Sequence, residues 1–567
     1  MPWKRTHRAV AVLVVLAAAA LGCRTAAPAA GGAGAAAAGE RTFAILAIND
    51  VYRIEGVDGG RRGHLARLRT LRARFEERYP DLLLLHAGDA LFPSFASRTF
   101  DGAQMIDVLN SLDGDAAAFD PRMFATLGNH EFDQDDLADA ALLDDRIEES
   151  AFWWFASNVR FVSGETGLPL VAGHNLLTRT IVAAGGVRVG LFGLTIDNKH
   201  PAYVESFADY AATAREQTAA LREAGAEVVV ALTHLDQQQD AEILFELQGA
   251  GPDLVIGGHD HSKQAAEVDG RWILKADADA VTATVVEVTV PAGGGLPRVA
   301  HRWVELDDTL PLDPAVAAQV ESWGDLHDRL FCAAANQPPG CLAVEIGRTA
   351  VELVAEELEI RRFETNLGNW VADRMLEPFD ETGELPEGVP AGLPLVAFVN
   401  SGSLRLNQDV APGPVTRQTI EELFAYPAPL QLIEIDGATL DQVASRAVEG
   451  WSGGGWWLQI AGWAFRHDPQ AGTATDLTLL TPDGPRPVAD DERILAVTQR
   501  YLVDPNMGDQ DGYDMLGMRQ VVAEGPDLKQ LVIDALGEAI SGGIAPQVEG
   551  RICNPVRDEL PCLAVGE

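Results

Sequence analysis

The sequence has few basic residues, and very few of these are lysines. Its 567 residues contain 43 Lys and Arg against 84 Asp and Glu, a formal net charge of −41, and only five of the basic residues are lysine. A surface with this charge repels a phosphate backbone, so we expect no nucleic-acid polymer among its partners. Long hydrophobic runs are missing after residue 22, which predicts no transmembrane helix in the mature chain.

The length and the apolar content indicate a multidomain globular protein. At about 150 residues per domain the chain is long enough for two to four domains. Apolar residues make up 47% of the sequence, which is ample for hydrophobic cores and argues against wholesale disorder.

The N-terminus has the pattern of an export signal. Three basic residues (Lys4, Arg5 and Arg8) precede an apolar run at 9–21 that is too short to span a bilayer. The run ends in Ala-Leu-Gly-Cys, which resembles a bacterial lipobox and implies cleavage after residue 22 and a lipid on Cys23. An ordinary signal peptide cleaved at a nearby alanine is the alternative. The Ala/Gly-rich residues 23–40 then read as a lipidated tether. We therefore expect an exported lipoprotein that faces the periplasm or the cell exterior and touches the membrane only through its anchor.

Cysteine is scarce, and its spacing favours an oxidising compartment. Besides Cys23, four cysteines form two close pairs, Cys332 with Cys341 and Cys553 with Cys562. Four cysteines allow three connectivities, and proximity favours two local disulfides.

Strands and helices alternate over the first half of the mature chain. Apolar runs predict strands at 42–48, 82–86, near 127, at 190–195, 228–232 and 254–256, and helical spacing predicts helices at 61–77, 204–223 and 239–248. This alternation is typical of a layered α/β domain, which we assign to residues 41–305. A helical connector at 306–360, a second domain at 361–548 and a tail at 549–567 follow.

Polar residues follow the ends of five predicted strands. In α/β sheets, ligands bind beyond the carboxyl ends of the strands, so these turns point to one site. Oxygen and imidazole donors suit divalent ions, and an Asp shared between two ions would give a two-metal hydrolytic site. His64 and His86 we interpret as structural. The turns carry, in order, Asp50, Gly88-Asp89, Gly128-Asn129-His130-Glu131, His234 and Gly257-Gly258-His259-Asp260-His261.

The words GNHEFD (128–133) and GGHDH (257–261), in this order, resemble the calcineurin-like metallophosphoesterases, and specifically the bacterial 5′-nucleotidase group. ETNLGNW (364–370), NSGSLR (400–405) and DGY (511–513) are similar to elements of the 5′-nucleotidase C-terminal domain. The resemblance implies an N-terminal β-sandwich flanked by helices and a C-terminal α/β domain that contacts substrate.

The resemblance also implies a role for each matching residue. His130, oriented by Asp133, would stabilise charge on the phosphoryl group or the leaving oxygen. Two divalent ions, most plausibly Mn, Zn or Co, would be held by Asp50 and His261 on one side, by Asn129, His234 and His259 on the other, and by Asp89 between them.

One position departs from the family pattern. The family usually has Asp-x-His at the first motif, whereas this chain has Asp50-Val51-Tyr52. Three readings stay open: Tyr52 binds a metal as phenolate, water takes the position, or the site has lost one metal and much of its activity.

In the second domain the resemblance implies four substrate contacts. Arg405 matches a phosphate-facing arginine, Tyr426 and Tyr501 match two rings that stack on the base, and Asp511 matches a residue that accepts ribose hydroxyls. Ordinary core or rim packing is the alternative for both tyrosines. A further arginine of the family is absent, and Glu357 lies close to its place.

Together these features predict a phosphoesterase that hydrolyses nucleotide phosphomonoesters to nucleoside and phosphate. The alternatives are a nucleotide-sugar diphosphatase or a 2′,3′-cyclic nucleotide phosphodiesterase. The rival outside the enzymes is a degenerate lipoprotein that binds nucleotide or metal without turnover. The sequence indicates no oligomeric state.

Overall fold

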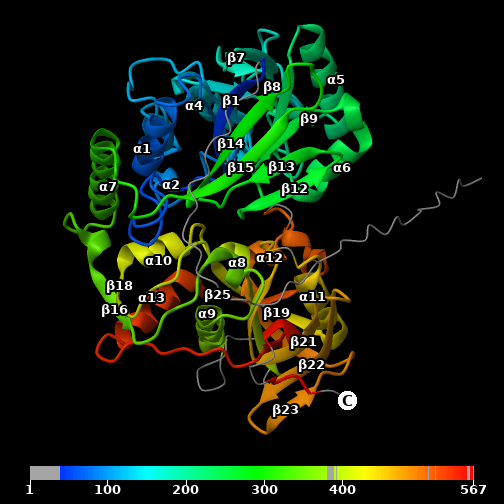
Figure 1. The fold of residues 1–567 in the computed structure, drawn as a ribbon. Coiled ribbons are helices and arrows are strands. Elements are labelled where there is room, and N and C mark those ends of the chain that lie inside the picture. Colours follow the sequence, from blue (N-terminus) through cyan, green and yellow to red (C-terminus); the bar gives the residue numbers. More distant parts are fainter. Residues whose placement is uncertain are drawn as a thin grey trace, which may run out of the picture.

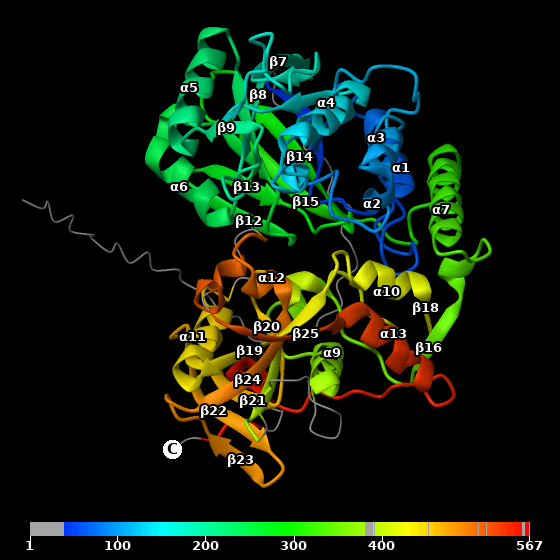
Figure 2. The ribbon, with the colours of Figure 1, turned by 180° about the vertical axis from the view of Figure 1, so that it is seen from behind.

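The computed structural model describes residues 39–379, 389–390, 392–451, 453–507, 510–517, 519–557 and 562–565. In it the chain forms two α/β domains that lie one above the other (Figures 1 and 2). The predicted signal peptide, Cys23 and nearly all of the tether lie outside the described residues. Within the described part, no helix is both long and apolar enough to cross a membrane.

Two mixed sheets form the centre of the N-terminal domain. The first sheet has the order β15-β14-β1-β2-β3-β4-β6 and the second β12-β13-β11-β10-β8-β7. The first contains β1 (Arg41–Ile48), β2 (Leu83–His86), β3 (Met123–Thr126), β4 (Trp153–Phe155), β6 (Leu176–Leu177), β14 (Thr282–Val290) and β15 (Arg298–Glu305). The second contains β7 (Arg179–Ala184), β8 (Val187–Thr195), β10 (Val228–His234), β11 (Leu254–Gly257), β12 (Gln264–Val268) and β13 (Arg271–Lys275).

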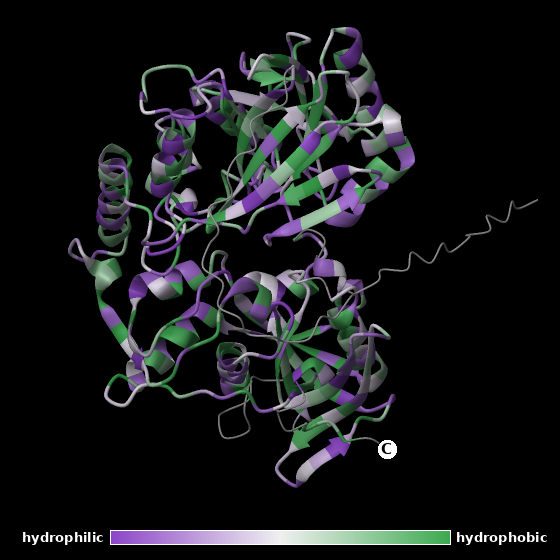
Figure 3. Ribbon diagram, viewed as in Figure 1, coloured by the Kyte–Doolittle hydropathy of each residue, from purple (hydrophilic) through white to green (hydrophobic). Residues whose placement is uncertain are grey.

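The two sheets pack face to face, and helices cover their outer faces. Phe43 and Leu83 of the first sheet share a core with Val189 and Val230 of the second. The central strands are buried on both faces, which explains their unbroken apolar runs. One outer face is covered by α1 (Leu65–Glu76), α3 (Ala103–Leu109) and α4 (Ala140–Glu149), and the other by α5 (Tyr210–Glu223) and α6 (Gln237–Leu247). The short helix α2 (Ser97–Phe100) leads into α3. Figure 3 shows the apolar residues concentrated in these strands.

The predicted α/β fold with a helix-flanked β-sandwich is therefore confirmed, with one local error. The predicted helix at 204–223 begins only at Tyr210, because residues 204–207 form strand β9 (Val204–Phe207). This strand pairs with β5 (Val159–Phe161), a partner more than 40 residues earlier in the chain, which local spacing does not reveal.

A long helix leads to the second domain. Helix α7 (Pro314–Ala334) begins after the N-cap Asp313, and a disulfide joins Cys332 in its last turn to Cys341 beyond it. The next strand, β16 (Glu345–Thr349), pairs with β18 (Gly413–Thr416), so this part of the predicted connector is built into the C-terminal domain.

The C-terminal domain has a five-stranded and a four-stranded sheet. The five-stranded sheet, in the order β20-β17-β24-β19-β25, contains β17 (Leu395–Asn400), β19 (Pro429–Asp436), β20 (Leu458–Ala461), β24 (Arg493–Gln499) and β25 (Val521–Asp527). The other contains β21 (Trp463–Asp468), β22 (Thr473–Thr481), β23 (Gly484–Pro487) and β26 (Ile552–Cys553). The helices are α8 (Glu357–Ile360), α9 (Asn366–Leu376), α10 (Arg417–Leu423), α11 (Gly437–Val448), α12 (Arg500–Val503) and α13 (Leu528–Glu538).

The second predicted disulfide, Cys553–Cys562, is also present and fastens the tail beside β26. Both proximity pairings are therefore confirmed.

Candidate metal centre between the two domains

The strand-end residues meet at one edge of the two sheets. β1, β2 and β3 pair in parallel, as do β8, β10 and β11, so the carboxyl ends within each set lie side by side. The six predicted metal ligands follow these ends, and the site lies where the two sheets face the C-terminal domain (Figure 1).

The first group of donors surrounds Asp50. His261 Nε2 lies 3.2 Å from Asp50 Oδ1, and Asp50, Asp89 and His261 each offer a ligand atom within 4.8 Å of the others. The Tyr52 hydroxyl lies among them, 3.1 Å from Asp89 Oδ2 and 2.9 Å from His261 Nε2. Burial, reinforced by the charges of Asp89 and Asp50, raises the pKa of Tyr52 well above its ordinary value.

The second group shares Asp89 with the first. His234 Nε2 lies 3.2 Å from Asp89 Oδ2 and 3.2 Å from Asn129 Oδ1. His259 Nδ1 lies 3.1 Å from the same Asn129 oxygen. On its far side, His234 donates from Nδ1 to the carbonyl of Ala87 at 2.7 Å, which leaves Nε2 facing the other donors.

The donor set fits divalent ions. Two donors that bind one ion at about 2.0–2.2 Å are themselves about 3 Å apart, and the separations above match that spacing. Carboxylate, amide and imidazole donors suit Mn, Zn or Co. The predicted ligands thus lie close together, and Asp50, Asp89 and His261 form a possible metal site.

The backbone is strained where it carries these donors. Asp50 (φ 51°), Asp89 (φ 58°), His259 (φ 78°) and His261 (φ 56°) all have left-handed conformations, which non-glycine residues rarely adopt. Such strain gathers at functional sites, where the surrounding structure enforces it. Next to them Gly128 is required, because a Cβ there would lie 2.1 Å from Asp89 Oδ1.

Glu131 holds two of the ligand turns together. Its buried carboxylate accepts hydrogen bonds from the backbone N–H groups of Asp89 (3.0 Å), Ala90 (2.7 Å) and Gly128 (2.5 Å). Burial, together with the charge of Asp89, raises the pKa of Glu131 to about 7. No role for Glu131 was predicted from the sequence, although its position inside the GNHE motif indicated that it lies beside the predicted ligands.

His130 and Asp133 form the predicted pair. His130 Nδ1 lies 2.9 Å from Asp133 Oδ1, and the Lys199 ammonium contacts the same carboxylate. Although burial raises it, the charges of His130 and Lys199 bring the pKa of Asp133 well below its usual range. Burial lowers the pKa of His130, and the Asp133 carboxylate opposes that change. The backbone N–H of His130 separately donates to Asp89 Oδ1 at 2.8 Å.

The C-terminal domain reaches this centre at two points. The Tyr426 hydroxyl donates to Asp133 Oδ2 at 3.1 Å. Glu357 Oε2 lies 2.7 Å from His261 Nδ1. Burial lowers the pKa of His261, but the charges of Glu357 and Asp50 outweigh burial and raise it to about 10.

The predicted substrate residues fall into two groups. Arg405 donates from Nε to the Gly402 carbonyl at 2.7 Å, and its guanidinium lies 5.7 Å from the ring centre of Tyr426. In the other group, Asp511 accepts from Asn400 Nδ2 at 2.6 Å and from the Tyr501 hydroxyl at 3.4 Å. Tyr426 is 41% exposed, so its ring is accessible to a ligand.

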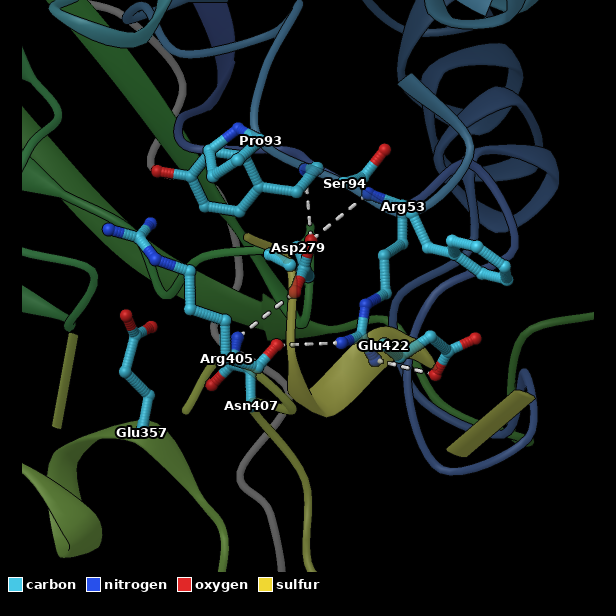
Figure 4. A pocket seen from close by; sticks show the side chains of 11 residues that line it. Arg53, Pro93, Ser94, Asp279, Glu357, Arg405, Asn407 and Glu422 are labelled. Atoms are coloured by element: carbon cyan, nitrogen blue, oxygen red, sulfur yellow. Dashed lines mark hydrogen bonds and ion pairs between the residues drawn. The ribbon is translucent and has the colours of Figure 1, made fainter. Parts of the chain in front are cut away.

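A pocket lies between the domains beside Tyr52. It has about 430 Å³ of empty space, part of which belongs to the open solvent outside, and is lined by both domains. Figure 4 shows Glu357 and Arg405 on one side of it and Arg53 on the other. Arg53 donates to the Arg405 carbonyl at 3.1 Å, and Asn407 donates to Asp279 at 3.0 Å, so hydrogen bonds join the domains along this pocket.

Of the two histidines interpreted as structural, one caps a helix, and the other lies in a buried strand within electrostatic reach of Asp50, Asp89 and His234. His64 caps helix α1 by accepting from the Ala66 N–H at 3.1 Å. His86 is fully buried in β2, and burial lowers its pKa to about 4. Lys199 was not predicted from the sequence, because it is 66 residues from its partner Asp133 and no local pattern marks it.

Comparison with known proteins accounts for both domains. Residues 43–263 match the calcineurin-like phosphoesterase family, and residues 345–517 match the 5′-nucleotidase C-terminal domain. Similar proteins include the snake venom 5′-nucleotidase of Naja atra, 26% identical over 76% of this chain and 82% of that protein. The 5′-nucleotidase of Rattus norvegicus is 24% identical over 86% of this chain and 85% of its own.

A solved structure matches the whole arrangement. The 5′-nucleotidase precursor of Thermus thermophilus superposes with a TM-score of 0.72 at 22% identity, covering 90% of this chain and 99% of that one. Calcineurin-like phosphoesterases use a dimetal centre, and the Asp/His group described above is a possible site for it. The chain therefore belongs to the calcineurin-like phosphoesterases that carry a 5′-nucleotidase C-terminal domain, and it is a phosphoester hydrolase.

Proposed function

We propose that this protein is an exported two-metal enzyme that hydrolyses nucleotide phosphomonoesters to nucleoside and phosphate. The observation that carries the proposal is the position of Asp89. Its Oδ2 lies 3.1 Å from the Tyr52 hydroxyl in the first donor group and 3.2 Å from His234 Nε2 in the second. A carboxylate shared in this way is what a pair of adjoining ions requires.

In the proposed site, Asp50 and His261 would hold one ion, Asn129, His234 and His259 would hold the other, and Asp89 would contribute to both. Mn, Zn and Co suit these donors. When bound, such ions lower the pKa of a water molecule and neutralise charge that develops on the phosphoryl group.

The protein's own residues then handle the leaving group. His130 lies beside the donors, and Asp133 fixes its Nδ1, so Nε2 is the nitrogen left to face substrate. We assign to His130 the donation of a hydrogen bond or proton to the phosphoryl group or the departing oxygen. Lys199 contacts Asp133 and keeps that carboxylate ionised, although the Lys199 charge itself lowers the pKa of His130.

The C-terminal domain supplies the proposed substrate contacts. Arg405 lies beside the exposed ring of Tyr426, which suits a phosphate next to an aromatic group. We assign phosphate binding to Arg405 and base stacking to Tyr426 and Tyr501. Asp511 accepts hydrogen bonds in the group that includes Tyr501, which suits a role with ribose hydroxyls.

We also propose export and lipid anchoring through Cys23. The basic n-region, the short apolar run and the lipobox-like end support this location. The two disulfides support it independently, because disulfides persist in oxidising compartments.

The test is phosphate release from a panel of 5′-mononucleotides, nucleotide sugars and 2′,3′-cyclic nucleotides, with Mn²⁺, Zn²⁺ or Co²⁺ added. His130→Ala is compared with His174→Ala, which removes a histidine whose side chain is 66% exposed and paired with Glu148. We expect metal-dependent turnover of mononucleotides that collapses only in His130→Ala. Preference for a sugar nucleotide or a cyclic nucleotide would move the assignment to that substrate class. Binding of nucleotide without turnover at any metal would overturn the enzyme proposal.

The Tyr52→His variant distinguishes the three interpretations of Tyr52, which stands where the family pattern has a histidine. A large gain of activity in this variant would mean that the native site is crippled. Unchanged or lower activity would mean that the Tyr52 hydroxyl, or a water molecule beside it, fills the ligand position in the native site.

A further inference from the structure

The candidate metal ligand His261 belongs to the N-terminal domain but contacts a side chain of the C-terminal domain. Glu357 opens the short helix α8, and its Oε2 lies 2.7 Å from Nδ1 of His261, a residue 96 positions earlier in the chain. Both side chains are at most 10% exposed, so water competes little for the contact.

The contact fixes which nitrogen of the ring faces the donor group. A carboxylate at Nδ1 accepts its N–H, so Nε2, on the opposite side of the ring, is the nitrogen that can release its proton and offer a lone pair to an ion. On that side His261 Nε2 lies 3.2 Å from Asp50 Oδ1. Glu357 thus stands behind the imidazole, in the place where ligand histidines commonly have an orienting partner.

Glu357 is itself held in place. Arg361, one helical turn further along, pairs with its Oε1 at 2.5 Å. The two carboxylate oxygens therefore have separate partners, one in each domain. Figure 4 shows the Glu357 side chain rising from its helix toward this boundary.

The corresponding histidine of the other donor group is held differently. His234 has its Nδ1 on the carbonyl of Ala87, which belongs to the N-terminal domain itself. One group is thus complete within its own domain, and the other depends on a side chain from the second domain.

We infer that Glu357 is a positioning residue through which the C-terminal domain holds the His261 ring in the orientation that binds one of the two metal ions. The inference rests on the proposed two-metal function. It adds that the C-terminal domain contributes to metal affinity as well as to substrate contacts, and that it does so at one ion only.

The experiment is a Mn²⁺ titration of the mature protein without substrate, followed by equilibrium dialysis and electron paramagnetic resonance. Glu357→Gln and Glu357→Ala are compared with the wild type. Glu356→Gln is the matched control, because it makes the same charge change one residue earlier, where an amide oxygen can still accept the Glu359 N–H.

We expect the wild type to bind two ions per chain. Loss of an orienting partner typically weakens metal binding by about 10–100-fold. Both Glu357 variants should therefore lose about 10–100-fold in affinity at one ion and keep the other unchanged, and Glu356→Gln should match the wild type. Excess Mn²⁺ should restore phosphate release in Glu357→Gln, which a purely structural loss would not allow.

Three outcomes would overturn the inference. Two tight Mn²⁺ sites in every variant would overturn the role of Glu357 and leave the two-metal proposal intact. A wild type that binds no Mn²⁺, Zn²⁺ or Co²⁺ would overturn both. Equal loss at both ions would also contradict it, because His234 has its own support.

Discussion

Replacing Asp133 tests whether the carboxylate acts through His130. It contacts three side chains: His130 at 2.9 Å, Tyr426 at 3.1 Å and Lys199. Asp133→Asn keeps an oxygen that can accept from His130 but removes the negative charge. Asp133→Ala removes both. Neither change takes away a predicted metal ligand, and the His130 backbone N–H still donates to Asp89.

The size of the effect follows from what the pair contributes. General acid–base catalysis by a positioned side chain contributes about 10²–10⁴ in rate, or about 3–5 kcal/mol. We expect kcat to fall by about 10²-fold in Asp133→Asn and by up to about 10⁴-fold in Asp133→Ala, the limit set by loss of the whole effect. Bound Mn²⁺ should stay unchanged in both variants.

The pH dependence of kcat should shift in a defined direction when Asp133 is replaced. The Asp133 carboxylate opposes the lowering of the His130 pKa by burial, so its removal lowers that pKa further. If protonated His130 is the active form, the alkaline limb of kcat must move to lower pH. The assay is steady-state phosphate release over about pH 5 to 9, the range in which histidines titrate.

Asp135→Asn is the matched control, since this exposed aspartate lies two residues along and loses the same charge. An Asp133→Ala variant that keeps wild-type kcat and an unmoved alkaline limb would refute the reasoning. A fall equal to that of Asp135→Asn would show only a general electrostatic effect.

Three further predictions concern packing and stability. Gly128→Ala would place a Cβ 2.1 Å from Asp89 Oδ1, so we expect Mn²⁺ binding to weaken by at least about tenfold in equilibrium dialysis. Unchanged binding would mean that the turn can shift to make room for the Cβ. Burial, with nearby acidic charge, raises the pKa of Glu55 from 4.5 to about 7. The folded protein then holds more protons between these values, so its stability falls as pH rises through them, and Glu55→Gln should gain up to about 3 kcal/mol at pH 8 but little at pH 4 in urea unfolding. An equal gain at both pH values would contradict this. Replacing both Cys332 and Cys341 by serine opens a short loop and should cost about 2–3 kcal/mol in denaturant unfolding without reductant; no loss would mean that the loop is already ordered in the unfolded chain.

Much of the site was predictable because its donors share one local signature. Asp50 and Asp89 follow buried apolar strands, His234 ends one, and parallel strands bring such ends together without further information. The disulfides were predictable for a similar reason, since nearby cysteines close short loops. Each of these features depends on residues that are close in sequence or on the general geometry of a sheet.

What was missed depends on contacts between distant segments. Lys199 meets Asp133 across 66 residues, and Glu357 meets His261 across 96. A lone lysine after a strand and a glutamate at the start of a short helix have no pattern that distinguishes them from solvated surface. Strand β9 falls within a predicted helix because its partner β5 lies far away in the chain, where local spacing does not reveal it.

Contacts across the domain boundary also bear on how this protein can change over evolutionary time. Tyr426 meets Asp133, and Glu357 meets His261, so a change on one side of the boundary alters the surroundings of a residue on the other. A chimaera that joins this N-terminal domain to a relative's C-terminal domain keeps both contacts only if the relative supplies a hydroxyl and a carboxylate at these two places. The two halves are therefore expected to diverge in step, with a substitution on one side followed by a compensating one on the other.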